Sequence, residues 1–191
     1  MVGNIKYPIY KVKVEGLVPL LIHKMTVEET AKIEGTSKRI SGKEQITPEE
    51  TARSYLYLTN DGKPYVPSEY FYGAMVKVAS NFRIPGKGKK TYKDLIKSAI
   101  DIKPDVILIK SKGWVVDTRT VVNPNTRGNR MIRHRPKFEK WSCEFEIIIL
   151  DEQLPFDVVK EILEYAGRYN GIGDYRPRFG RFTVTQFEPK S

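Results

Sequence analysis

The stretch Ala166-Gly-Arg-Tyr-Asn-Gly-Ile-Gly-Asp-Tyr-Arg-Pro-Arg-Phe-Gly-Arg-Phe182 lies between a helical pattern and a strand pattern. Glycine permits positive φ and lets a backbone approach a ligand closely. Arginine supplies planar, bidentate donors that suit phosphate. The stretch interleaves both residue types with aromatic rings: its glycines are Gly167, Gly171, Gly173 and Gly180, and its arginines are Arg168, Arg176, Arg178 and Arg181. This combination predicts a loop that holds a polyanion.

The segments on either side of this loop have clear periodicities. Residues 155–166 carry apolar side chains spaced by three and four, which predicts an amphipathic helix. We expect Gly171 or Gly167 to end that helix. Residues 182–187 alternate between apolar and polar side chains and predict the last strand.

The same patterns predict the elements nearer the N-terminus. Strict alternation predicts strands at residues 10–15 and 141–150, and a short apolar run predicts a buried strand at 105–110. An apolar stripe predicts a helix within 67–82, with Gly73 inside it at a cost of roughly 1 kcal/mol relative to alanine. We therefore expect close packing or the approach of another backbone at that glycine.

Without its insertions the chain runs strand, helix, strand, strand, helix, strand, which is the order of the split βαβ, or ferredoxin-like, fold. The expected fold class is α+β: an antiparallel sheet with two helices and a long inserted hairpin. One insertion covers about 24–60; we expect its first part, 24–41, to be mobile, and a helix to follow at 48–57. The other covers 111–140 and predicts the hairpin. No composition break occurs, so we expect a single domain over residues 1–191.

The composition restricts the possible partners. The 191 residues carry a formal net charge of +10, with a pI near 9.5, which favours nucleic acid or an anionic surface. No apolar run reaches 18 residues and no signal-peptide core is visible, so we expect a cytoplasmic protein without a membrane partner. The single cysteine, Cys143, excludes an internal disulfide, and the Lys/Glu content hints at a thermophile. We expect no metal and no cofactor.

Two further basic clusters accompany the glycine-rich stretch. Residues 127–140 carry six cations against the single carboxylate of Glu139, a density that favours phosphate recognition over simple solvation. Residues 83–93 form a lysine-rich loop, which is either an electrostatic contact or an ordinary surface loop. The cations concerned are Arg127, Arg130, Arg133, Arg135, Lys137 and Lys140 in the first cluster, and Lys87, Lys89 and Lys90 in the second. Aromatic residues that could stack on bases are Trp114, Phe138, Trp141 and Tyr175.

Two nucleotide-binding interpretations fail. The lysine-rich loop lacks the G-x-x-x-x-G-K-[ST] spacing and follows a predicted helix rather than opening one. In the glycine-rich stretch, Arg176 occupies the place where a dinucleotide fold needs its third glycine, and a strand follows rather than a helix.

Catalytic residues are few. The chain has two histidines, His23 and His134, and no H-E-x-x-H motif. Either histidine could act in metal-independent general acid–base cleavage of RNA. A structural role is the more common one for a histidine at a strand end such as His23.

Two stretches resemble one family. Gly171-Ile-Gly-Asp-Tyr-Arg-Pro-Arg-Phe-Gly-Arg-Phe182 is similar to the glycine-rich loop before the final strand of the repeat-associated mysterious proteins (RAMPs), the ferredoxin-like subunits of CRISPR effector complexes. Tyr65-Val-Pro-Ser-Glu-Tyr-Phe-Tyr-Gly-Ala74 resembles the entry to that family's first helix. The element order agrees, and the resemblance covers the scaffold of about 110 residues.

The resemblance implies single-stranded nucleic acid held across the sheet and by the glycine-rich loop. It implies that the 127–140 region forms part of a thumb that separates bases, and that subunits assemble side by side along the strand. In the processing-nuclease branch a histidine often cleaves RNA, a role that only His23 or His134 could fill here. A stand-alone relative from a virus or mobile element, binding single-stranded DNA, is an equal possibility.

The resulting hypothesis is a non-enzymatic, largely sequence-independent single-stranded nucleic-acid-binding protein that forms homo-oligomers on its ligand. Its expected binding residues are the basic residues named above with Gly171, Gly173, Arg176, Arg178 and Arg181. The alternatives are a metal-independent endoribonuclease of the same fold and a basic scaffolding protein with an acidic protein partner. DNA and RNA stay equally possible, because phosphate grips and aromatic stacking serve both.

Overall fold

A computed structural model describes residues 7–25, 46–122, 128 and 130–190. We expected residues 24–41 to be mobile, and all of this segment except residues 24 and 25 lies outside the described residues. Most of the expected turn at 123–129 lies outside them as well. In the described part of the chain, no helix is long and apolar enough to cross a membrane.

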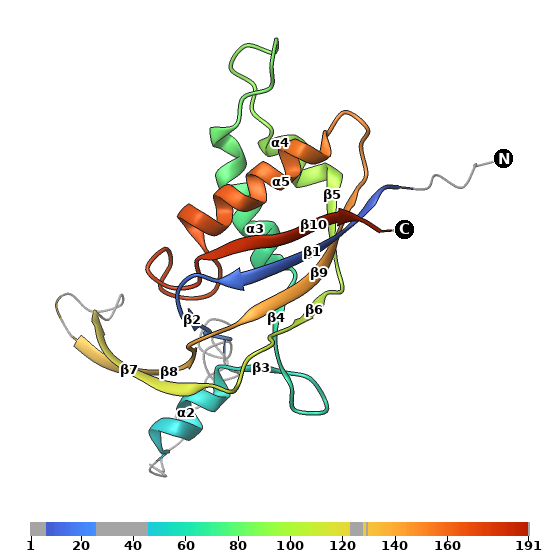
Figure 1. Cartoon of the computed structure of the whole chain (residues 1–191). Helices are drawn as coiled ribbons and strands as arrows, with labels where there is room; N and C mark the ends of the chain where they lie inside the picture. Colours follow the sequence, from blue (N-terminus) through green and yellow to red (C-terminus); the bar gives the residue numbers. More distant parts are fainter. Residues whose placement is uncertain (1–6, 26–45, 123–127, 129, 191) are drawn as a thin grey trace, which may run out of the picture.

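The centre of the molecule is a four-stranded antiparallel sheet (Figure 1). Its strands are β1 (Ile9–Gly16), β5 (Ile100–Lys103), β9 (Ser142–Ile149) and β10 (Phe182–Pro189), in the spatial order β10-β1-β9-β5. Two helices, α3 (Glu69–Val78) and α5 (Phe156–Tyr165), contact each other and cover one face of the sheet. The predicted ferredoxin-like arrangement is thus confirmed.

The core lies between that face and the helices, and periodicity explains it. On β9 the alternate residues Cys143, Phe145, Ile147 and Ile149 are buried, as the sequence pattern predicts. The Phe71 ring of α3 lies 4.4 Å from the Phe145 ring, which joins the helix layer to the sheet. Each such fully buried side chain stabilises the fold by about 1.5–3 kcal/mol.

One predicted strand is in the wrong place. The apolar run at 105–110 does not form a strand of the central sheet. It contains β6 (Val106–Leu108), in a small separate sheet with β3 (Tyr57–Leu58) and β4 (Pro64–Pro67), and only Lys110 at its end forms an isolated bridge to Ser142 of β9. The central position belongs to β5, which follows directly from a short unpredicted helix, α4 (Lys93–Ala99). Only two side chains of β5, Ile100 and Ile102, are buried, so its alternation was too short to stand out.

The predicted long hairpin is confirmed. β7 (Val115–Val122) and β8 (Arg130–Phe138) pair along their whole lengths, and β2 (Leu20–Leu21) adds a third strand beside β8. We call β7 and β8 the thumb hairpin. It extends away from the central sheet, and α2 (Pro48–Ser54) packs against it (Figure 1).

The helix predicted in the first insertion is α2, and its N-terminus is formed as the sequence suggests. The Thr47 hydroxyl accepts a hydrogen bond from the backbone N–H of Glu50, while the Glu50 carboxylate accepts one from the N–H of Thr47. This capping box satisfies two otherwise unpaired donors. Within the first insertion, α2 therefore packs against the thumb hairpin and supports it.

Candidate nucleic-acid interface

The glycine-rich loop starts where α5 continues into a π-helical turn, η2 (Ala166–Asn170). This turn ends at Gly171, which has φ 70°, and the loop runs from there to the start of β10. Its glycines face the protein's own backbone. A Cβ on Gly171 would lie 2.8 Å from the carbonyl of Gly180, and one on Gly173 would clash with the carbonyl oxygen of Leu21. The expected role in bringing backbone close to a ligand is therefore wrong for Gly171, which is buried, and both glycines shape the loop. Gly173 is half-buried and lines a surface hollow, so its contact with a ligand stays a prediction.

Hydrogen bonds fix this loop to the strand entering the thumb sheet. The N–H of Asp174 donates to the Leu21 carbonyl at 2.8 Å, and the N–H of Gly180 donates to the Pro19 carbonyl at 2.9 Å. The residues between them, from Tyr175 to Arg178, are exposed and project from this anchored base. The sequence stretch thus forms a rigid platform rather than a mobile loop.

Asp174 joins three parts of the molecule. Its Oδ2 lies 2.6 Å from Nε of Arg135, on the thumb hairpin, and 3.6 Å from Nδ1 of His23, which follows β2. The Arg135 contact is an ion pair rather than a well-aligned hydrogen bond. Burial acts to raise the pKa of Asp174, but the contact with His23 and the charge of Arg135 outweigh it, so the pKa lies below the usual 3.8.

The Arg135 side chain is 8% exposed and is occupied by this carboxylate. It therefore cannot reach a phosphate as expected from sequence; its charge instead holds the thumb hairpin against the glycine-rich loop. Sequence reasoning missed Asp174 because a single acid within a basic stretch carries no signal of its partner.

Replacing Asp174 by asparagine tests this connection through its pH dependence. A carboxyl group whose folded pKa is depressed contributes stability that is present above its unfolded pKa, near 4, and is lost as pH falls through the folded value. We expect wild type to be more stable than Asp174→Asn at pH 7, with the difference closing below about pH 4. Urea unfolding of both proteins from pH 7 to pH 3 measures this, and a pH-independent difference would contradict the proposed ion pair.

A groove of about 570 Å³ lies where the thumb hairpin meets the glycine-rich loop. We call it the hairpin groove. Residues from three distant segments line it. They are His23 after β2, Arg130, Arg133 and Arg135 on β8, and Tyr175 on the glycine-rich loop. Arg133 also donates from Nη1 to the Tyr55 hydroxyl at 3.4 Å, a long contact. Two of the predicted binding arginines, Arg130 and Arg133, and the predicted stacking residue Tyr175 therefore lie on one surface, together with the ion-paired Arg135.

The Arg119 side chain of β7 lies over the ring of Tyr175. The buried carboxylate of Asp117 accepts two hydrogen bonds from Arg119, at 2.6 and 2.9 Å, and fixes that guanidinium. The guanidinium lies 4.6 Å from the Phe179 ring centroid and 5.8 Å from that of Tyr175, within the range of cation–π attraction. Tyr175 itself is 45% exposed. This stacked group was missed from sequence, although Asp117 and Arg119 share one strand face.

A second concave surface lies beyond Arg176, along α3. Two adjoining hollows of about 370 and 350 Å³ share Lys77 and Arg176, and we call them together the helix groove. Gly73 lines the first hollow with open space where its Cβ would be, so the close packing expected there is absent and the backbone of α3 is accessible. Tyr169, which is 57% exposed, lines the second. Lys77 was missed because it stands in no basic cluster. Tyr169 lies within the glycine-rich stretch, but it was not among the predicted binding or stacking residues.

Two predicted stacking residues are wrong. Phe138 is fully buried, and Trp141 is 4% exposed, with its Nε1 donating to the Val18 carbonyl at 2.9 Å. Both rings belong to the hydrophobic core, because residues at the end of β8 and start of β9 turn inward toward it. Trp114 is only partly buried and also packs against the core.

The other predicted residues are dispersed. Arg178 is exposed on the glycine-rich loop, whereas Arg181 is partly buried. Lys137 pairs with Glu139 at 2.7 Å, and Nδ1 of His134 lies 2.8 Å from the Thr118 hydroxyl across the hairpin. Arg127 lies outside the described residues. The lysine-rich loop, with Lys87, Lys89 and Lys90, projects from the opposite end of the molecule from the thumb hairpin (Figure 1).

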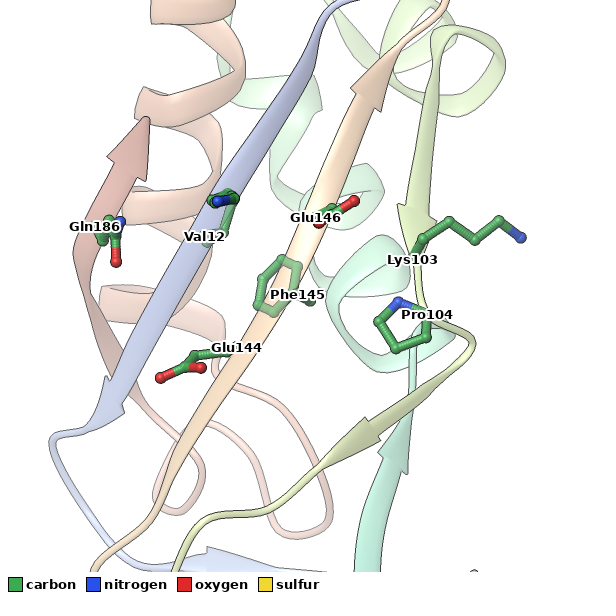
Figure 2. A pocket seen from close by; sticks show the side chains of 8 residues that line it. Val12, Lys103, Pro104, Glu144, Phe145, Glu146 and Gln186 are labelled. Carbon is green, nitrogen blue, oxygen red and sulfur yellow. The ribbon is translucent and has the colours of Figure 1, made fainter. Parts of the chain in front are cut away.

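The uncovered face of the central sheet does not share this basic character. A shallow hollow of about 560 Å³ there places Lys11, Lys103, Glu144, Glu146 and Gln186 together, so cations and carboxylates balance (Figure 2). The carboxylates are also paired: Glu144 with Lys110 at 2.6 Å, and Glu146 with Lys190 at 2.7 Å. The charges give no support to the expectation that nucleic acid crosses this face.

No family model and no curated protein matches the sequence. Among solved structures, a chain of type III-B Cmr-beta bound to cognate target RNA, determined by cryo-EM, is similar over 97% of this chain with a TM-score of 0.60 and 13% identity. The chain has a RAMP-like fold. The chain spans 61% of the length of that Cmr-beta chain. Cmr6 from Pyrococcus furiosus aligns over 96% of this chain and 99% of its own, with a TM-score of 0.45 and 12% identity.

In the part of the chain that the structure describes, no three His, Cys, Asp or Glu side chains gather as a metal site would require. What the hairpin groove offers chemically is positive charge, an exposed aromatic ring and one histidine.

Proposed function

We propose that this protein binds single-stranded nucleic acid in the hairpin groove and across the glycine-rich loop. The observation that carries the proposal is the convergence of Arg130, Arg133 and Tyr175 on one groove. The two arginines lie on β8, and Tyr175 lies 42 positions or more further along the chain. Arginines there can hold successive phosphates, while the Tyr175 ring can stack on a base.

The geometry favours a single strand over a duplex. Stacking on Tyr175 requires a base that is free of its neighbours, and such bases are found in single strands, bulges and ends. The ring is exposed and supported by the Arg119 guanidinium, so it presents a flat surface with little freedom to lose on binding. Stacking of this kind contributes about 1–3 kcal/mol per base and is tolerant of sequence.

Further cations lie where a bound nucleic-acid strand would leave the hairpin groove. Arg176 follows Tyr175 directly and lines the helix groove with Lys77, so a strand that leaves the hairpin groove over the glycine-rich loop meets two further cations. Arg178 is exposed on the same loop. The RAMP-like fold is compatible with this use, since the similar Cmr-beta structure is described as bound to target RNA.

Side-by-side assembly along the strand is the arrangement that the resemblance implies, and we propose it for the bound state. Size-exclusion chromatography with light scattering, with and without a long single strand, tests it. A complex that contains one protein chain on a strand long enough for several would contradict assembly.

The binding proposal itself is tested by titrating single-stranded DNA, single-stranded RNA and duplex of equal length at about 50 and about 200 mM salt. We expect single strands to bind more tightly than duplex, and the affinity for them to fall steeply with salt because counterions are released from the strand. Failure to bind any single strand at about 50 mM salt would instead favour the scaffolding alternative with an acidic protein partner.

A second candidate, RNA cleavage, is favoured by one observation. His23 lines the hairpin groove beside Asp174, with Nδ1 toward the carboxylate, and Arg133 and Arg135 line the same groove. In a metal-independent reaction, Nε2 of His23 would accept the proton of a ribose 2′-hydroxyl as its oxygen bonds to phosphorus. The bond to the 5′-oxygen then breaks, that oxygen takes a proton from water, and a 2′,3′-cyclic phosphate remains. His134 does not line this groove.

Incubating labelled RNA with the protein in EDTA separates the two candidates. Cleavage that His23→Ala abolishes, and that a 2′-deoxy substitution at the scissile position prevents, would make the protein an enzyme. Intact RNA, bound with unchanged affinity by His23→Ala, is the result we expect for a binding protein.

A further inference from the structure

The lysine-rich loop at residues 83–93 is too far from the hairpin groove to belong to it, and nothing proposed above uses it. We infer that this loop is a second, remote contact for the same nucleic-acid strand, reached by way of the helix groove. The inference rests on the proposed function. It extends the binding surface from the hairpin groove, along the helix groove, to the lysine-rich loop.

The loop is built rather than loose. A β-bridge between Arg83 and Thr91 closes its base, and the N–H of Ile84 donates to the Lys90 carbonyl at 2.9 Å. Gly86 and Gly88 have φ values of 72° and 62°, which allow the chain to reverse within a few residues. An ordered backbone of this kind holds its side chains in place before a ligand arrives, which lowers the entropy cost of binding.

The charge on the loop is of one sign. Residues 83–93 contain five cations and no carboxylate: Arg83, Lys87, Lys89, Lys90 and Lys93. All five are exposed, and within the described residues none of them forms a salt bridge. By comparison, several lysines elsewhere pair with carboxylates, among them Lys103 with Asp105 at 2.9 Å and Lys110 with Glu144 at 2.6 Å. The loop is thus an uncompensated positive surface.

The helix groove leads toward the loop. It begins at Arg176, next to Tyr175, and its second hollow ends at Asn81, two residues before Arg83. Contact between the Phe82 and Tyr165 rings, with centroids 5.4 Å apart, fixes the start of the loop beside α5 and that hollow. A strand that follows the cations from the hairpin groove past Arg176 and Lys77 therefore arrives at the lysine-rich loop. This continuity favours a nucleic-acid strand over an acidic protein as the partner.

The length of the ligand provides the test, because only a long strand can reach both ends. The wild type and the triple variant Lys87→Ala, Lys89→Ala, Lys90→Ala are titrated with single-stranded oligonucleotides from roughly 6 to roughly 30 nucleotides, lengths that bracket common site sizes. A matched control, Lys11→Ala, Lys103→Ala, Lys160→Ala, removes the same charge from surfaces where we place no strand. Circular dichroism confirms that each variant is folded.

We expect the shortest oligonucleotides to bind wild type and triple variant equally. The longest should bind the triple variant about ten-fold more weakly than the control, with the slope of log affinity against log salt reduced by about 2, the value for three lost phosphate contacts. If the triple variant and the control bind oligonucleotides of every length with equal affinity, the inference is overturned, and an acidic protein is left as the partner of the loop. An equal loss at every length would also overturn it, because the loop would then belong to a single site. If wild type binds no strand of any length, the proposed function itself has failed.

Discussion

Replacing Arg130 and Arg133 together by alanine is expected to weaken single-strand binding by about 10- to 100-fold near 100 mM salt while the domain stays folded. Each arginine that holds a phosphate contributes a charge-assisted contact, and such contacts are worth about 1.5–3 kcal/mol before screening by salt. Two lost phosphate contacts should also reduce the slope of log affinity against log salt by about 1.4.

The fold should survive this change because both residues line the hairpin groove, while the hydrophobic core is formed elsewhere. The hydrogen bond from Arg133 to Tyr55 is lost, but at 3.4 Å it is a weak one. Lys11→Ala with Lys160→Ala removes the same net charge at a distance and serves as the matched control. Unchanged affinity and an unchanged salt slope in a folded Arg130/Arg133 variant would show that the hairpin groove is not the interface.

Replacing Gly180 by alanine is expected to destabilise the protein by about 3 kcal/mol or more, the range of large single-site effects. Gly180 has φ 72°, and in this left-handed region a side chain costs roughly 1–2 kcal/mol. In addition, the new Cβ would overlap the carbonyl oxygen of Ile172, a backbone atom that cannot rotate away. Relieving the overlap would break the hydrogen bond from the Ile172 N–H to the Gly180 carbonyl, which closes the loop.

Gly73→Ala supplies the contrast. Gly73 lies within α3, and no atom lies within 4 Å of its missing Cβ, so alanine should stabilise the helix by up to about 1 kcal/mol. Urea unfolding of the two variants and wild type measures both effects. A Gly180→Ala protein within about 0.5 kcal/mol of wild type, the range of neutral surface changes, would refute the internal role that the structure assigns to this glycine.

Much of the scaffold followed from sequence because its elements have strong periodicity. The alternation on β9 and the apolar stripe of α5 each extend over about ten residues, and both burial patterns agree with the structure. The helix predicted at 48–57 likewise begins at the expected residue, as α2, although it ends at Ser54. In contrast, β5 has four residues and takes its place in the sheet from pairing with β9, a contact between segments about 45 positions apart. Such short elements are determined by tertiary packing, which local patterns do not contain.

The candidate site was predictable in composition but not in detail. The sequence predicted binding residues in the thumb hairpin and in the glycine-rich loop, and the structure brings these two segments together in one groove. It could not tell which members of each cluster face solvent. Arg135 and Phe138 lie three positions apart on β8, and both are buried, one against Asp174 and the other in the core. Their partners come from distant segments, so no spacing rule could have excluded them.

The role of Gly171 was misjudged for a related reason. Positive φ and close approach were both correct for Gly171 and Gly173, but the sequence does not say what approaches. The structure shows that the neighbour is the protein itself. The surface that we propose for binding is consequently formed mainly by side chains on an anchored loop, with Gly173 also lining the helix groove.

The most direct test of the central claim is to locate the bound strand. Ultraviolet cross-linking of a single strand to the wild-type protein, followed by mass spectrometry of the peptides, reports which residues touch the bases. We predict cross-links at Tyr175 and on the β7 and β8 segments that line the hairpin groove. Cross-links confined to the uncovered face of the central sheet, on peptides that contain Lys11, Glu144 or Gln186, would contradict it.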